Sequence, residues 1–267
     1  MKQWMLVGAL SLLPTAAMAH VGFLLPNTFH IEDGETVTAI ASFSDHFPSS
    51  EHVLKSRDFH VLVPGGKRQS FADVATLDQL TVLTAEVKDT GVYRLSSGER
   101  LGRKGQVSRV DGSLVRLGAD GIDLSSLPDG APLLSSQTAT VSEAFIRKGE
   151  ATLPSTLTTS GRLSISVTSE RGAQFVPGSL LQVSALFDGQ PLKAGDVTIV
   201  SAFGSYTAEG EGRSFATDDQ GHATLSVDRA GPHVVFVRHM AEAPEGAETD
   251  VRSYTTALVF EVLPSAE

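Results

Sequence analysis

The sequence predicts an all-β protein, and three observations lead to this prediction. Short runs rich in Val, Ile, Leu, Thr and Phe alternate apolar and polar residues with the two-residue period of half-buried strands. Turn-forming sequences such as PGG, KDTG and TDDQG separate these runs. The best helix candidate, SFADVATLDQL over residues 70–80, is weak and short. The strand spacing favours two immunoglobulin-like β-sandwich domains.

The expected strands follow one another along the whole chain. Each alternates with period two and ends near Gly, Pro, Asp or Asn. They are ETVTAIASF (35–43), DFHVLV (58–63), LTVLTAEV (80–87), RLSISVTS (162–169), SLLQVSALF (179–187), GDVTIVSAF (195–203), HATLSV (222–227), PHVVFVRHM (232–240) and YTTALVFEV (254–262).

The first 19 residues have the features of a secretory signal peptide. Lys2 precedes the apolar run WMLVGALSLLP, and Ala17-Met18-Ala19 is a small-x-small cleavage site. The run is shorter than the roughly 20 residues that a transmembrane helix needs. We therefore expect cleavage before His20 and a periplasmic protein without a transmembrane anchor, the alternative being an uncleaved anchor.

The remaining chain divides into three predicted segments. Residues 20–150 form an N-terminal β domain, residues 151–165 a connector rich in Thr, Ser and Pro, and residues 166–267 a C-terminal β-sandwich. Within the first domain, residues 94–116 carry six cations in a stretch that contains only two acids. This basic segment is either a solvated hairpin, which we favour, or a docking loop for a partner or an anionic ligand.

The composition excludes several classes of function. The net charge of −10 argues against nucleic acid and anionic membranes as main partners, because both reward clustered cations. The chain has no cysteine and therefore offers no thiolate to a metal. Met240 is the only methionine beyond the signal, which excludes a methionine-rich copper(I) site. No G-x-S-x-G, H-E-x-x-H, P-loop or G-x-G-x-x-G motif is present, and we expect no enzymatic activity.

Several segments resemble a known family. AHVGFLLPNTF, DHFPSSE, FHVLVPGGK and DTGVYRL resemble the N-terminal domain of the DUF4198 family, also called NikM-like. FVPGSLLQVSALFDGQPLKAGDVTIVS, ATDDQGHATLSVDRAGPHVVFVRH and YTTALVFEV resemble its C-terminal domain. The resemblance implies a periplasmic, two-domain β protein that binds a metal during uptake of nickel or cobalt and that is not known as an enzyme.

His20 is the first candidate metal ligand. If cleavage makes it the first residue, its α-amine and its ring Nδ1 can close a six-membered chelate on one ion. The amine must lose a proton, but the pKa of a free α-amine is only about 8, so the cost near neutral pH is small. One further imidazole would give a three-nitrogen site suited to copper(II), nickel(II), cobalt or zinc, with copper(II) favoured on affinity.

Three further histidines are candidate ligands, and a fourth remains open. His46, in SDHFP after the run 35–43, matches a similar segment of the family and is the best partner. His239 lies at the far end of PHVVFVRHM, and His60 lies in DFHVLV, where a half-buried sheet position is the favoured interpretation. His52 qualifies if the chain folds back across Pro48.

These observations favour a periplasmic protein that holds a divalent transition metal (nickel, cobalt or copper) and assists its uptake or delivery. The expected partners are the metal ion and a membrane metal transporter or an outer-membrane receptor. A metal-free adhesion or ligand-binding module is the main alternative. A copper-dependent oxidative enzyme is disfavoured, because an aromatic substrate face is difficult to build from three tyrosines and no tryptophan beyond Trp4.

Overall fold

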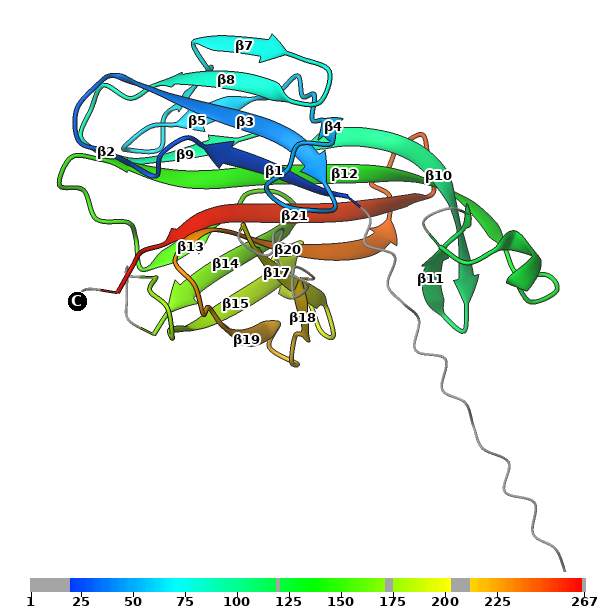
Figure 1. Ribbon diagram of the computed structural model, residues 1–267. Coiled ribbons are helices and arrows are strands. Elements are labelled where there is room, and N and C mark those ends of the chain that lie inside the picture. Colours follow the sequence, from blue (N-terminus) through cyan, green and yellow to red (C-terminus); the bar gives the residue numbers. More distant parts are fainter. Residues whose placement is uncertain (1–19, 119–120, 171–174, 203–211, 266–267) are drawn as a thin grey trace, which may run out of the picture.

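The computed structural model describes residues 20–118, 121–170, 175–202 and 212–265, so the predicted signal peptide lies outside the described residues. These residues form two five-stranded sheets and one eleven-stranded sheet, which stack as three layers with the large sheet in the middle (Figure 1). Within this part of the chain there is no α-helix, and a short 3₁₀ helix, η2, spans Leu124–Ser126. The all-β prediction is confirmed. None of the helices in the described ranges is long and apolar enough to span a membrane.

We call the outer layers the N-terminal and C-terminal sheets. The N-terminal sheet has the order β1 (Val21–Pro26), β3 (Thr36–Ser44), β8 (Thr81–Glu86), β7 (Asp73–Thr76), with β4 (His52–Val53) beside β3. The C-terminal sheet has the order β13 (Thr156–Thr158), β14 (Leu163–Ser169), β15 (Leu180–Phe187), β16 (Gln190–Pro191), with β19 (His222–Ser226) beside β15.

The central sheet contains strands from both halves of the chain. Its order is β18 (Arg213–Ala216), β17 (Asp196–Ser201), β20 (Gly231–Glu242), β21 (Val251–Val262), β12 (Leu133–Lys148), β9 (Gly91–Ser96), β5 (His60–Leu62), β6 (Arg68–Gln69). β10 (Arg100–Val110), β11 (Ser113–Arg116) and β2 (His30–Ile31) complete it. β12 pairs in parallel with β21, from Ser136↔Val251 to Ala144↔Val259. The two predicted domains therefore share one sheet, and part of the predicted connector is strand β13.

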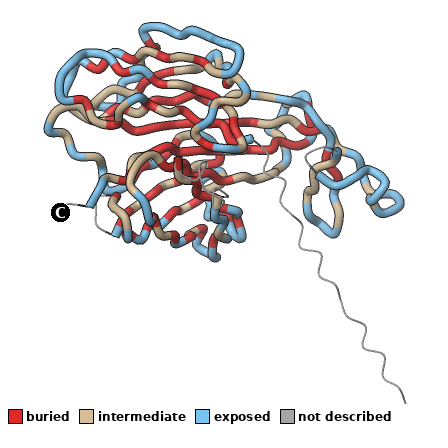
Figure 2. Tube along the Cα trace, viewed as in Figure 1, coloured by how far each residue is buried: buried red, intermediate tan, exposed pale blue. Residues whose placement is uncertain are grey.

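Each face of the central sheet covers one hydrophobic core, and the alternation of side chains along β20 shows why. Val234 and Phe236 belong to the core beneath the N-terminal sheet, whereas Val235 and Val237 belong to the core beneath the C-terminal sheet. Successive residues of a strand point to opposite faces, so a strand between two cores must be apolar at every position. Figure 2 shows the resulting band of buried residues through the middle layer.

The helix candidate over residues 70–80 is wrong. Its first half forms the edge strand β7, which pairs with β8, and a turn closes with a hydrogen bond from the Leu77 amide to the Leu80 carbonyl at 2.8 Å. Val74 and Leu77 in this segment are exposed and belong to neither hydrophobic core.

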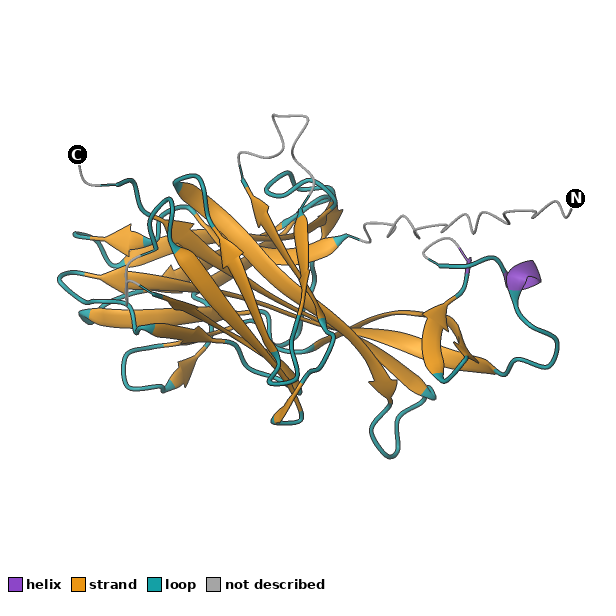
Figure 3. Cartoon of the chain, turned by 90° about the horizontal axis from the view of Figure 1, so that it is seen from below, coloured by secondary structure: helices purple, strands orange, loops and turns teal. Residues whose placement is uncertain are grey.

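The basic segment belongs to an arm made by β10, β11 and the start of β12, which extends from the body (Figure 3). Two of its cations pair with acids near the turn between β20 and β21. The Nζ of Lys104 lies 2.7 Å from Glu248 Oε2, and Arg109 binds Glu242. These exposed pairs fit the interpretation of a solvated hairpin, because pairs of this kind are common on surfaces and contribute little to stability.

Candidate metal centre

Strand pairing brings His20 next to the loop that follows β3. β1 pairs antiparallel with β3 in the register Val21↔Ser44, so His20 lies opposite the start of residues 45–51. This loop turns back into β4, where His52 pairs with Phe43. Residues that are far apart in sequence thus meet at one end of the N-terminal sheet. We call this group the histidine cluster and define it as His20, Asp45, His46, Glu51 and His52.

The His20 ring lies between a carboxylate and a second imidazole. Its Nδ1 lies 2.6 Å from Asp45 Oδ1, and its centroid lies 4.5 Å from that of His52, with the ring planes tilted by 34°. The His20 side chain remains 41% exposed. The nitrogen that would chelate a metal together with the α-amine is therefore the one directed at a carboxylate oxygen.

Glu51 organises the loop from within. Its carboxylate accepts hydrogen bonds from Ser44 Oγ at 3.0 Å, from the Asp45 amide at 3.2 Å and from His46 Nδ1 at 3.1 Å. Burial raises the pKa of Glu51, but these hydrogen bonds outweigh it and hold that pKa below its usual value of 4.5. Glu51 is therefore an anion at neutral pH and an available oxygen ligand.

The spacing of the donor atoms fits a small cation. One ligand atom each from His20, Asp45 and Glu51 lies within 4.8 Å of the other two. Metal–ligand bonds of about 2.0–2.2 Å place neighbouring ligand atoms roughly 3 Å apart. The His20–Asp45 contact must then open by a few tenths of an ångström, and Glu51 must move inward. The Asp45 Oδ1 atom is buried and lies 2.6 Å from His20 Nδ1, but it accepts no well-aligned hydrogen bond from the described residues.

His46 belongs to the cluster but lies at its outer side. Its amide donates to Ser44 Oγ at 2.7 Å, which fixes the backbone, and its ring is 72% exposed and contacts Glu51 from the solvent side. His46 therefore reaches the candidate site through Glu51.

His60 and His239, predicted as ligands, lie elsewhere. His60 is buried in β5 and its Nδ1 lies 2.7 Å from the Asp58 carbonyl. The His239 ring packs 4.6 Å from Phe187 on the face of β20 that covers the C-terminal core, and burial lowers its pKa. The neighbouring residue Arg238 faces the opposite side of the strand. Burial lowers the pKa of Arg238 to about 10, and the charge of Asp45 is one of those that oppose this fall. Neither His60 nor His239 joins the histidine cluster.

Sequence reasoning missed two carboxylates. Asp45 and Glu51 were not predicted as ligands, and His52 was left open. The sequence DHFPSSEH does place an acid beside a histidine on each side of Pro48, which is a signal that a folded-back loop would unite them. The distance between the two acid–histidine pairs depends on the turn, and only the structure supplies it.

Comparisons with known proteins show a family and distant structural likenesses. A family model described as a domain of unknown function (DUF4198) matches residues 17–241. No curated protein matches the sequence.

Among solved structures, a DUF4785 family protein from Legionella pneumophila is 12% identical, with 80% of this chain and 50% of that chain covered and a TM-score of 0.24. The adhesin InvE of Yersinia pseudotuberculosis is 15% identical, with 89% of this chain and 58% of the adhesin chain covered and a TM-score of 0.24. The chain thus spans about half the length of these proteins, and the likenesses are too weak to indicate a function.

Proposed function

The chain belongs to the DUF4198 family, a family of unknown function, and we propose that it binds a divalent transition metal and assists the uptake or delivery of that metal in the periplasm. The observation that carries the proposal is the histidine cluster, where His20, Asp45 and Glu51 offer ligand atoms within 4.8 Å of one another. His20 is also the residue that the predicted signal cleavage would place first.

Cleavage before His20 would complete the site with the α-amine. The amine and Nδ1 of a first histidine form a chelate, and the Nδ1 is already directed at Asp45. Asp45 and Glu51 then supply oxygen ligands. The His52 ring packs against that of His20 but is not among the three side chains whose ligand atoms lie within 4.8 Å of one another, so it would have to turn to supply a second imidazole.

The donor set restricts the metal. Imidazole and amine nitrogens with carboxylate oxygens suit copper(II), nickel(II) and cobalt(II), and the affinity for a given set is highest for copper(II). No thiolate is available, because the chain lacks cysteine. The 41% exposure of His20 leaves the ion accessible for transfer to a second protein, which fits delivery better than permanent storage.

The finer assignments rest on the family resemblance. We propose a NikM-like role in nickel or cobalt uptake, with a membrane transporter or an outer-membrane receptor as the partner. We also propose that each outer sheet forms an immunoglobulin-like sandwich with the central sheet.

Metal titration of the secreted protein tests the proposal. Intact mass spectrometry first establishes whether the exported chain begins at His20. Calorimetric titration with copper(II), nickel(II) and cobalt(II) then compares the wild type with a chain carrying one extra Ala before His20 and with Glu51→Gln. His222→Gln is the matched control, because His222 lies on β19 in the opposite outer sheet.

We expect the extra Ala to weaken binding at least a hundredfold, because it displaces the amine from the chelate, and Glu51→Gln to weaken it about tenfold, since a lost charged ligand costs roughly 1.4 kcal/mol or more. Equal affinity in the wild type and the extended chain would exclude the chelate. Absence of binding in every variant would favour the metal-free ligand-binding module.

A further inference from the structure

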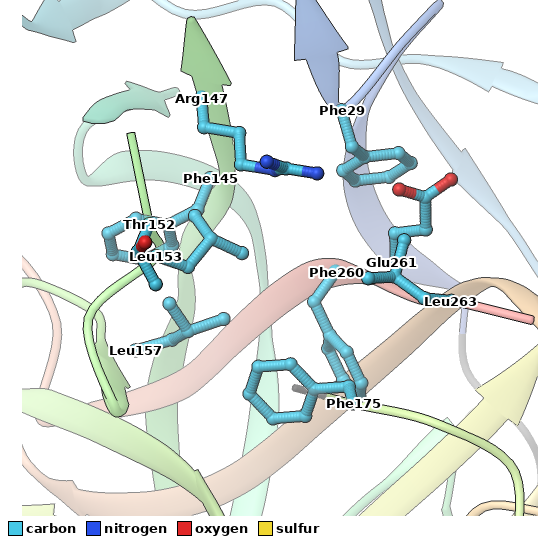
Figure 4. A pocket seen from close by; sticks show the side chains of 10 residues that line it. All are labelled: Phe29, Phe145, Arg147, Thr152, Leu153, Leu157, Phe175, Phe260, Glu261 and Leu263. Carbon is cyan, nitrogen blue, oxygen red and sulfur yellow. The ribbon is translucent and has the colours of Figure 1, made fainter. Parts of the chain in front are cut away.

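A second candidate site lies at the opposite end of β1 from the histidine cluster. A cavity of about 180 Å³ opens where residues 152–157 pass over the ends of β12 and β21. Four phenylalanines, Phe29, Phe145, Phe175 and Phe260, line it together with leucines (Figure 4). The six residues of β1 separate it from the cluster by about 20 Å. This cavity therefore has no part in the proposed metal site.

The aromatic part of the cavity wall is buried. Phe145, Phe175 and Phe260 are at most 9% exposed, and the rings of Phe175 and Phe260 pack with their centroids 5.2 Å apart. An engineered apolar cavity of about 150 Å³ in another protein stays dry and binds benzene. The volume here accommodates a phenyl ring or a branched alkyl group, and an occupant would restore packing contacts that an empty space lacks.

Two oppositely charged side chains are among the residues that line the cavity. Arg147 extends from β12 and Glu261 from β21, and both charged groups lie beside Phe29 in the view of Figure 4. Neither side chain makes a hydrogen bond or an ion pair with another described residue. Their charges nevertheless act on each other: burial raises the pKa of Glu261, and Arg147 and His30 oppose this rise.

Unpaired charges of both signs beside an apolar cavity define the ligand chemistry. We propose that the cavity binds a small zwitterion with an apolar body, the chemistry of an apolar α-amino acid. The ligand's carboxylate accepts hydrogen bonds from Arg147, its ammonium donates to Glu261, and its side chain fills the space between the phenylalanines. Arg147 suits a carboxylate because the planar guanidinium donates two parallel hydrogen bonds.

Titration with four related probes tests this proposal on the full mature chain. Ligand-observed and protein-observed NMR compare phenylalanine with 3-phenylpropionate, which lacks the ammonium, and with 2-phenylethylamine, which lacks the carboxylate. N-acetylphenylalaninamide represents the same side chain within a peptide. The variants are Arg147→Gln and Glu261→Gln, with Lys193→Gln as a control, because Lys193 is exposed and pairs with Asp219 on the surface.

We expect phenylalanine to bind about tenfold more tightly than either singly charged probe, since one charged hydrogen bond contributes at least this factor. Arg147→Gln should weaken the binding of phenylalanine and of 3-phenylpropionate about tenfold and leave that of 2-phenylethylamine unchanged. Glu261→Gln should weaken the binding of phenylalanine and of 2-phenylethylamine about tenfold and leave that of 3-phenylpropionate unchanged. Lys193→Gln should change nothing.

Three outcomes overturn the proposal. These are the absence of binding by every probe, equal affinity for all head groups in every variant, and tighter binding of the capped amide, which would assign the cavity to a peptide side chain. All of them leave the metal proposal untouched, because no titration with these probes involves the histidine cluster.

Discussion

Replacing Gly22 with alanine should disturb the candidate metal site without touching any ligand. Gly22 is the second residue of β1 and lies two positions after His20. A Cβ atom there would lie 2.9 Å from Phe43 Cε1, 3.0 Å from Ser142 Oγ and 3.1 Å from Thr140 Cγ2. The glycine thus lets β1 lie close against both β3 and the central sheet.

The size of the effect follows from these distances. Carbon–carbon contacts are most favourable at about 3.5–4.0 Å, so the new methyl group is too close to three neighbours at once. Overpacking of this kind costs about 1–3 kcal/mol of unfolding free energy. The start of β1 relieves the clash by moving, and a shift of about half an ångström exceeds the tolerance of roughly 0.2 Å of metal–ligand distances. We expect copper(II) affinity to fall about tenfold.

Two measurements on the same variant check this prediction. Urea unfolding reports the loss of stability, and calorimetric titration reports the metal affinity. Gly105→Ala is the matched control, because the nearest atom to its new Cβ is Ser136 Oγ at 3.5 Å, an ordinary contact. If Gly22→Ala equals Gly105→Ala in both stability and affinity, the close approach of β1 does not position His20 and the reasoning is refuted.

Two further predictions concern buried and paired carboxylates. Glu143 is fully buried and accepts hydrogen bonds from Ser96 Oγ at 2.8 Å and Ser160 Oγ at 2.5 Å. Glu143→Ala should therefore lower the free energy of unfolding in urea by about 3 kcal/mol, and Glu143→Gln should lower it by about half as much. Equal stability of both variants and the wild type would contradict this prediction. Hydrogen bonds from Arg162 hold the pKa of Asp188 below its usual 3.8. Its stabilisation is present above about pH 4 and lost as pH falls through the lowered pKa, so Asp188→Asn should flatten the acid limb of the melting-temperature profile; an unchanged limb would exclude this pair as its cause.

Local alternation predicted most strands correctly. ETVTAIASF became β3, where buried and more exposed side chains largely alternate. YTTALVFEV lies within β21, which is buried on both faces because it runs between the two cores. The weak helix candidate over residues 70–80 is wrong, because strand pairing sets the conformation of this segment. Val74 and Leu77 have the spacing of a helix face, but the pairing of β7 with β8 decides their conformation.

The candidate site was predictable in part. His20 and His46 stand out from the cleavage pattern and the loop motif, and both lie in the histidine cluster. Asp45 and Glu51 each stand beside a histidine, but the sequence does not fix the turn that brings the two acid–histidine pairs together. His239 has the same chemistry as His20, yet its position on the strand directs it to the C-terminal core, where it contacts Phe187.

The sequence by itself determined most of the strands and the types of metal ligand that the chain offers, because both depend on local residue patterns. These patterns are the period of two along the strands, the presence of imidazoles and carboxylates without thiolates, and the cleavage pattern before His20. The tertiary structure alone decided which groups meet. The register Val21↔Ser44 unites His20 with the loop after β3, and the parallel pairing of β12 with β21 makes one sheet of two predicted domains. Such pairings depend on the packing of residues distant in sequence, which a local pattern does not encode.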